Sequence, residues 1–241
     1  MEHKKLLILI VSILMVLLVP IILYGSNFNS VAFDEEFYKK EFLKYNVYDN
    51  LENYNIEDIN NDVLNYLKTN KNNELIKSDF FNDREKSHLL DVKNLIQKIS
   101  TLYYFSIILF FLLFILLTIS MNFKIEKIVK KLLLILLFGG FFTLLDTVIV
   151  IILSKFNFDF IFDLFHKTFF VSGTYLFNPE FENIVVLYPY NLFFDSILRI
   201  VSTTILSSII LLFFSIAALF FFFKSNFSKS FTKNTDGKNN K

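Results

Sequence analysis

The chain has 241 residues, of which 54% are hydrophobic and 18% aromatic, and its formal net charge is +1 at pH 7. A soluble domain of this length does not carry so much Phe, Leu and Ile in unbroken blocks, so the composition predicts a membrane protein. The near-neutral charge gives no reason to expect nucleic-acid binding. The chain contains no cysteine, which excludes disulfides, thiolate metal sites and a cysteine nucleophile.

The first apolar run covers residues 6–24, is interrupted only by Ser12 and Pro20, and follows two lysines. A bilayer core requires about 20 such residues as a helix. A signal peptide is the alternative, but its apolar core is usually about 7–15 residues long and ends in small residues. Here the run meets Tyr24, a poor cleavage context. We therefore expect residues 1–24 to form an N-terminal tail and a first span.

Residues 25–98 are polar but retain Tyr, Phe, Leu and Val throughout, which is too apolar for a disordered linker. Residues 34–45 (DEEFYKKEFLKY) have a mixed amphipathic pattern, and residues 62–68 (DVLNYLK) carry Val63, Leu64 and Leu67 at helical spacing. This segment therefore predicts a small, mostly helical domain between the first two spans.

A helix start is indicated at Asn82, because Asn accepts a backbone N–H at a cap and Glu85, three residues on, can reach back. The helix carries an apolar stripe, and His88 and Asp91 lie one turn apart beside it. It leads into the second span, residues 99–120.

The rest of the chain alternates between apolar and polar segments. We expect a loop at 121–131, a third span at 132–154, a loop at 155–190, a fourth span at 191–223 and a disordered basic tail at 224–241. Lysines cluster before the first span, between the second and third, and after the fourth. The positive-inside rule then places both termini and the 121–131 loop in the cytoplasm, and the two long polar segments outside. The predicted fold class is a mainly α polytopic membrane protein with four transmembrane helices and a small extracytoplasmic helical domain between spans 1 and 2.

Two histidines are the candidate catalytic groups. The third, His3, lies in the N-terminal tail, whereas His88 and His166 both face outward in this topology. Each has an aspartate three residues away, Asp91 and Asp163. A neutral imidazole can move a proton near neutral pH, and a neighbouring carboxylate fixes its tautomer. The alternative is that both histidines are packing residues.

A metal site is not expected. Glu85, His88 and Asp91 lie at i, i+3 and i+6, a spacing that drifts around the helix, and zinc sites usually use more His or Cys. The sequence has no Gly-rich phosphate loop and no G-x-S-x-G turn. Ser172, beside Gly173, is the one serine of interest near His166, and its signal is weak. The missing nucleophile suggests that the substrate supplies it.

Asp146 and Arg199 lie inside or beside apolar runs, each about 12 Å from the predicted end of its span. A lone charge in a membrane is costly, so we expect the two to pair. If the fourth span begins near Ile200, Arg199 instead lies at the interface and could hold a substrate carbonyl or phosphate. A small transporter that uses these two charges is an alternative function, as is a non-catalytic receptor or accessory protein.

Two segments resemble the signature regions of the lipoprotein intramolecular transacylases, a family of bacterial membrane proteins. Residues 81–93 (FNDREKSHLLDVK) match an R-E-x-x-H-x-x-D-V pattern, and residues 162–189 match an F-H pattern that ends in an aromatic residue and Pro. The matching positions are Arg84, Glu85, His88, Asp91 and Val92, then Phe165, His166, Phe169, Phe170, Glu182, Tyr188 and Pro189. The chain departs from the pattern at Asn82, Tyr175 and Glu182, where Ser or Thr, Trp and Asp are usual.

The resemblance implies an acyltransferase of the bacterial cell membrane that moves the sn-2 acyl chain of a diacylglyceryl-cysteine lipoprotein onto the α-amino group of that cysteine. It implies lipoprotein and membrane lipid as partners and requires no cofactor. His88 and His166 correspond to the functional pair. We expect His166 to be the base and His88 to support the oxyanion or the leaving oxygen, or the reverse. The residues expected to orient these groups or bind substrate are Asp91, Asp163, Arg84, Glu85, Tyr175 and Arg199.

Overall fold

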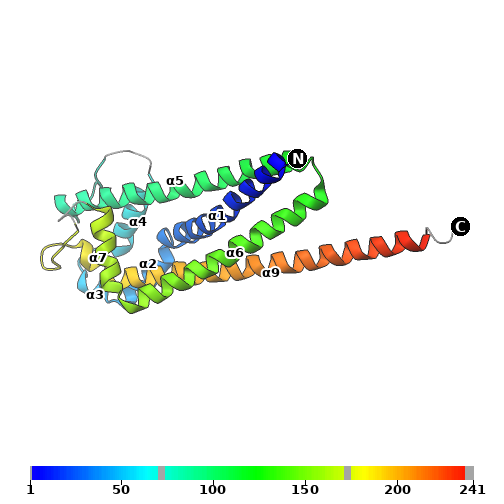
Figure 1. The fold of residues 1–241 in the computed structure, drawn as a ribbon. Coiled ribbons are helices and arrows are strands. Elements are labelled where there is room, and N and C mark those ends of the chain that lie inside the picture. The colour runs from blue at the N-terminus through cyan, green and yellow to red at the C-terminus, as the bar shows by residue number, and fades with distance from the viewer. Residues whose placement is uncertain (1, 70–73, 171–174, 237–241) are drawn as a thin grey trace. The chain divides into compact units, whose positions relative to one another are not determined.

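The computed structural model describes residues 2–69, 74–170 and 175–236, and within these ranges the chain is helical without a strand (Figure 1). This confirms the mainly α class. The elements are α1 (Glu2–Ala32), α2 (Glu35–Lys44), α3 (Val47–Asn50), α4 (Ile56–Lys68), α5 (Asp83–Ser120), α6 (Ile125–Phe156), α7 (Phe158–Phe169), α8 (Ile184–Leu187) and α9 (Tyr190–Asp236).

Among the described residues, four helices are long and apolar enough to cross a membrane, in agreement with the predicted number of spans. They cover Glu2–Ala32, Asp83–Ser120, Ile125–Leu153 and Tyr190–Phe222. Each is longer than the apolar run inside it, because helical hydrogen bonding continues past the apolar residues. At 1.5 Å per residue the helix α5 is roughly 57 Å long, nearly twice the bilayer core of about 30 Å. Its polar first turns, which carry His88, therefore extend beyond the apolar run.

One compact unit, here called the span unit, comprises the described residues of 2–23, 105–147 and 204–236. Its core joins Val11, Met15 and Leu18 of α1 to residues of α5 and α6. Gly139 of α6 allows a close approach of α1, since a Cβ at this position would lie 2.5 Å from the Cβ of Val19. Small residues permit such contacts between membrane helices.

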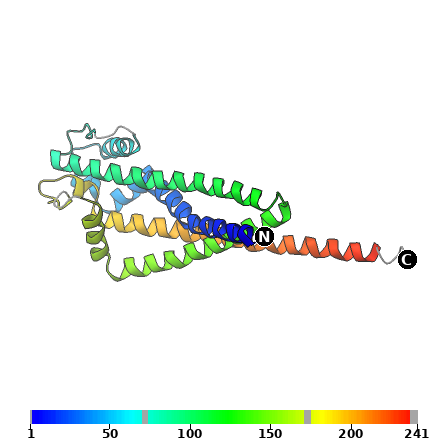
Figure 2. The same cartoon turned by 45° about the horizontal axis from the view of Figure 1, so that its top comes forward.

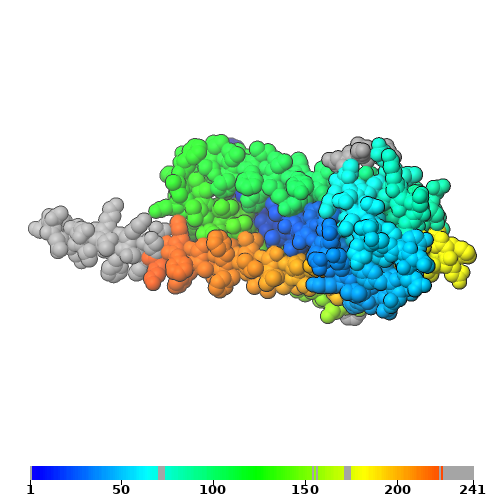
Figure 3. Space-filling view, turned by 180° about the vertical axis from the view of Figure 1, so that it is seen from behind, coloured from blue at the N-terminus to red at the C-terminus, as the bar shows by residue number. Residues whose placement is uncertain are grey.

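The second compact unit, here called the aromatic unit, comprises the described residues of 24–104 and 148–203. Its core gathers apolar side chains from α2, α3, α4, α5 and α8, and the rings of Tyr38, Phe42 and Tyr188 pack against one another. The hydroxyl of the half-buried Tyr188 donates a hydrogen bond at 3.0 Å to the side-chain oxygen of the buried Asn60. Figure 3 shows α2 to α4, in blue to cyan, forming one continuous surface with the first turns of α5.

Local caps explain where the helices of this unit begin. The Asp34 carboxylate accepts the Phe37 N–H at the start of α2. At the start of α5, Asn82 accepts the Glu85 N–H at 3.0 Å, and the Glu85 carboxylate accepts the Asn82 N–H at 2.6 Å. This reciprocal capping box confirms the predicted helix start. Burial of Val63 and of its neighbours in α4 likewise follows the predicted helical spacing.

Two segments differ from the simplest interpretation of the sequence. The helix α9 continues to Asp236, into the segment for which composition predicts disorder, because no Gly or Pro interrupts the chain from Lys224 to Asp236. The segment between α6 and α9 contains α7, a short helix capped by Asn157. Figures 1 and 2 show α7 running across the direction of the neighbouring first turns of α5.

Candidate active site

The two internal histidines meet inside the aromatic unit. His88 lies in the first turns of α5 and His166 near the end of α7. Their ring centroids are 6.5 Å apart, and the ring planes are nearly parallel, at 17°. Residues 78 positions apart in sequence are thus brought close enough to act on one small functional group.

Aromatic rings surround both imidazoles. Phe170 and Phe177 meet the His88 ring edge-on at centroid distances of 4.8 and 5.2 Å. The His166 ring contacts Phe162, Phe165, Phe170 and Tyr175 at 4.1–5.4 Å. His88 is 8% exposed, and His166 is half-buried. The pair therefore lies in an environment that excludes much of the water, which strengthens the electrostatic interactions there.

A backbone carbonyl fixes the tautomer of His166. Its Nδ1 lies 2.7 Å from the carbonyl oxygen of Phe162, so neutral His166 donates from Nδ1 and keeps a free lone pair on Nε2. Burial lowers the pKa of His166 below its usual value, while the Phe162 carbonyl and the nearby Asp163 charge oppose that shift. Burial therefore favours the neutral imidazole, in which Nε2 is able to accept a proton.

His88 has an unsatisfied ring nitrogen. Its Nδ1 is buried and has no hydrogen-bond partner in the part of the chain that the structure describes. A buried polar atom without a partner costs free energy and often marks a functional position. Burial beside another imidazole also disfavours a positive charge on His88.

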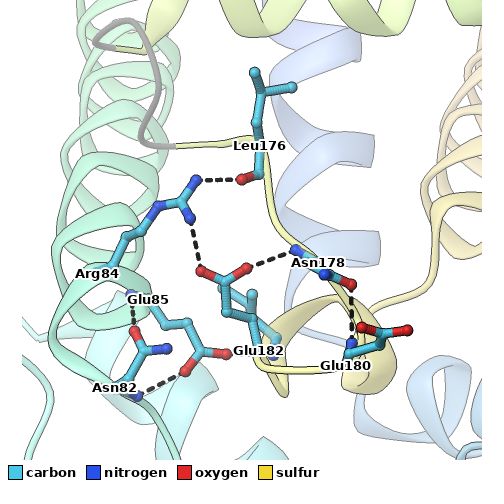
Figure 4. Close-up of polar contacts among 8 residues, drawn as sticks. Asn82, Arg84, Glu85, Leu176, Asn178, Glu180 and Glu182 are labelled. Atoms are coloured by element: carbon cyan, nitrogen blue, oxygen red, sulfur yellow. Dashed lines mark hydrogen bonds and ion pairs between the residues drawn. The ribbon is translucent and has the colours of Figure 1, made fainter.

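Arg84 and Glu85 hold the second motif segment against α5 (Figure 4). The Arg84 guanidinium donates to Glu182 at 2.7 Å and to the Leu176 carbonyl. The Glu85 carboxylate accepts the Ile184 N–H at 2.7 Å and is 1% exposed. Arg84 also lies over the ring of Phe177, which contacts His88. Both residues therefore position the segment that forms one wall around His88.

The predicted aspartate partners are arranged differently. Asp163 pairs with the exposed Lys167 at 2.6 Å, and the Phe162 carbonyl takes the position beside His166 Nδ1. In a helix this carbonyl, four residues earlier, competes well with a carboxylate three residues earlier. Asp91 makes no hydrogen bond to His88 among the described residues. Neither carboxylate orients its histidine in this structure.

The predicted pairing of Arg199 with Asp146 is wrong. Arg199 pairs with Asp34 at the start of α2 and lies over the Phe37 ring at 4.8 Å. Asp34 thus caps α2 with one carboxylate oxygen and binds Arg199 with the other. Because Arg199 is held in this way, the transporter hypothesis loses the charge pair on which it depended.

The sequence predicted that Tyr175 orients the catalytic groups or binds substrate. The structure places its ring 5.1 Å from that of His166. Sequence reasoning missed Phe170 and Phe177 as walls and the Phe162 carbonyl as the partner of His166. Only the position of Phe162, four residues before His166, could have indicated that carbonyl. The weak candidate Ser172 lies outside the described residues. Within the described ranges, no group of three or more His, Asp or Glu is arranged to hold a metal.

Comparisons with known proteins agree on one family. Residues 9–194 match the family described as lipoprotein intramolecular transacylase Lit. A solved structure of the membrane integral lipoprotein intramolecular transacylase Lit from Bacillus cereus is similar, with a TM-score of 0.73 and 19% identity, over 93% of this chain and 98% of that one. Variants of that protein with one histidine replaced by alanine or arginine are similar at 18% identity, with TM-scores of 0.72 and 0.73. The alanine variant aligns over 90% of this chain and 95% of its own, and the arginine variant over 95% and 97%. No curated protein matches the chain in sequence.

Proposed function

Because the chain belongs to the lipoprotein intramolecular transacylase family and is therefore a multi-pass membrane acyltransferase, we propose that it moves the sn-2 acyl chain of diacylglyceryl-cysteine onto the α-amino group of the same cysteine. The product is an N-acylated lipoprotein in the lyso form. The observation that carries this proposal is the pair of nearly parallel imidazoles, 6.5 Å apart, within a cage of aromatic rings.

The reaction needs a base, an acid and stabilisation of an oxyanion. A protein α-ammonium has an ordinary pKa of about 7.7–8.0, so it must lose a proton before it attacks. His166 is the candidate base, because its Nδ1 is occupied by the Phe162 carbonyl and Nε2 is left to accept a proton.

Attack of the amine forms the N–C bond at the sn-2 ester carbonyl and gives a tetrahedral oxyanion. His88, whose Nδ1 is buried and unpartnered among the described residues, is the candidate contact for this oxyanion or for the leaving oxygen. When the C–O bond breaks, the glyceryl oxygen takes a proton and the nitrogen loses its second one. The products are an amide, a free hydroxyl and one released proton. No enzyme nucleophile is required, since the attacking amine and the ester belong to one molecule.

We further propose that the helical segment between the first two spans is extracytoplasmic. The charge pattern supports this orientation, because basic residues cluster at the N-terminal end of α1, around the connection between α5 and α6, and after the apolar part of α9. Both termini would then be cytoplasmic, and both histidines would act at the outer face, where lipoproteins carry their lipid.

Replacing each histidine separately tests the catalytic assignment. With His88→Gln or His166→Gln, we expect formation of the N-acyl lyso product to fall at least about 100-fold, because positioned acid–base groups contribute roughly 10²–10⁴-fold. The readout is mass spectrometry of lipoprotein N-termini, alongside the thermal stability of each purified variant. The exposed third histidine supplies the control, and His3→Gln is expected to behave as wild type. Product formation within tenfold of wild type in both folded variants would refute the assignment.

A further inference from the structure

A groove of about 390 Å³ opens beside the histidine pair in the aromatic unit. It is formed by one face of α5 and the end of α7. Its lining residues are Asp91, Asn94, Leu95, Lys98, Ile99, Leu102 and Phe169. A volume of this size falls within the usual range for sites that bind small molecules.

The groove begins one helical turn from each histidine. Asp91 follows His88 by three residues on α5, and Phe169 follows His166 by three residues on α7. Side chains three apart on a helix are neighbours on its surface, about 5–6 Å apart at Cβ. The end of the groove at Asp91 and Phe169 therefore lies one helical turn from both imidazoles, although its lining uses different side chains.

The groove changes in character along α5. Asp91 and Asn94 are half-buried near the histidines, and Lys98 lies about 10 Å beyond Asp91 at helical rise. The apolar lining continues to Leu102, which is 53% exposed, and Phe169 on the other wall is 54% exposed. A negative charge thus lies one turn from His88, and uncovered apolar surface lies at Leu102 and on the opposite wall at Phe169.

The Asp91 carboxylate is available to a ligand. No ion pair or hydrogen bond engages it among the described residues, and it does not orient His88. A carboxylate that is half-buried beside apolar side chains is better stabilised by a cation than by partial solvation. The complementary ligand carries a cationic group next to a long apolar chain.

We propose that Asp91 binds the α-ammonium group of the substrate cysteine while one glyceryl-borne acyl chain lies along Leu95, Ile99, Leu102 and Phe169. This inference rests on the function proposed above and names how that substrate is held. Asp91 holds the amino terminus as a cation one turn from His88, close to His166, the candidate base that takes its proton. Lys98 repels the ammonium from the far end, so the charge pattern of the groove fixes the direction in which the lipid enters.

The test measures binding without acyl transfer. The probes are a dialkylglyceryl-cysteinyl peptide, whose ether links in place of esters cannot transfer a chain, and the same peptide acetylated on its α-amine. Full-length protein in lipid nanodiscs is titrated with each fluorescently labelled probe. Asp91→Asn is expected to weaken binding of the free-amine probe about tenfold or more, because a charge-assisted contact is lost. Binding of the acetylated probe should stay within about twofold, because that probe has no cation to lose.

Two further variants separate charge from shape. Lys98→Gln should not weaken the free-amine probe, whereas Leu102→Asn should weaken both probes alike through the acyl chain. If Asp91→Asn does not fold, Asp91→Glu keeps the charge and should still prefer the free amine over the acetylated probe. Equal loss of both probes in Asp91→Asn, or no loss of either, overturns the proposal. Failure of wild-type protein to produce N-acyl product from the ester substrate would instead refute the proposed function, since ether binding does not depend on it.

Discussion

The span unit and the aromatic unit are stabilised in different ways. Hydroxyl side chains in the spans donate to carbonyls of their own helix, as Thr143 does to Gly139 and Ser208 does to Thr204, both at 2.8 Å. In the aromatic unit, the main polar contacts join segments far apart in sequence, such as Arg84 with Glu182 and Tyr188 with Asn60. In a membrane, polar groups must be satisfied locally, and shape then determines packing.

Because of this difference, the geometry of the candidate site depends on contacts within the aromatic unit. His88 and His166 lie on separate helices, and the walls around them depend on long-range polar contacts through Arg84 and Glu85. The span unit contributes close apolar packing, as where Gly139 lies against Val19. Disrupting a polar contact in the aromatic unit should therefore affect catalysis, whereas disrupting a glycine contact in the spans should affect stability alone.

The largest effect is expected from Glu85→Ala. This change leaves the N–H groups of Asn82 and Ile184 without acceptors and opens a cavity at a side chain that is 1% exposed. Together these losses should cost roughly 3 kcal/mol and displace the wall around His88. The measurements are the temperature at which half the purified protein aggregates and the rate of N-acyl product formation, both of which should fall.

Two other glutamate variants serve as controls for Glu85→Ala. Glu85→Gln keeps the shape and one strong acceptor oxygen, so its loss should be smaller than that of Glu85→Ala. Glu126→Ala removes an exposed carboxylate in the first turn of α6 and should leave both measurements near wild type. If Glu85→Ala were as stable as Glu126→Ala, the capping box would not contribute to the fold as the contacts indicate.

A smaller and purely structural effect is expected at Gly139. In Gly139→Ala the new methyl would lie 2.5 Å from the stiff Cβ of Val19, so α1 and α6 must separate, at a cost of about 1–3 kcal/mol. The adjacent Gly140→Ala is the matched control. Its methyl would lie 3.3 Å from the Leu212 side chain, which can shift, and alanine favours the helix. Heat stability should fall only in Gly139→Ala, while both variants keep wild-type activity at low temperature.

Much of this architecture could be predicted from local sequence patterns. Apolar runs indicated the four spans, and Asn82 with Glu85 indicated the start of α5. These features depend on residues within one or two helical turns. The meeting of His88 and His166 was expected only from outward topology and the family resemblance, because no spacing rule connects two helices so far apart in sequence.

What the sequence could not provide were the choices among competing partners. Asp34, not Asp146, pairs with Arg199, since tertiary packing brings the start of α2 to α9. Asp163 turns to Lys167, while a backbone carbonyl takes the histidine. In the sequence, each of these carboxylates has several possible partners whose interactions would be of similar strength. Which partner it binds is decided by the tertiary fold.

The smallest effect is expected from replacing Asp163, which was predicted to orient His166. This change tests whether Asp163 contributes to the function of that histidine. If neutral His166 is the base, as proposed, activity should fall as the pH drops through the pKa of His166. Because burial lowers that pKa, the acid limb of kcat/KM should lie below the ordinary histidine value of about 6.5. The Asp163 charge raises the same pKa, so Asp163→Asn should move the limb slightly further toward low pH. The rate at pH 7 should stay within about twofold of wild type, because an exposed carboxylate paired with Lys167 is screened by solvent.

Initial rates from pH 5 to 8, with Lys167→Gln as the matched control, measure the position of the acid limb. A large loss at pH 7 in Asp163→Asn, with Lys167→Gln unaffected, would show that Asp163 and not the Phe162 carbonyl sets the tautomer of His166.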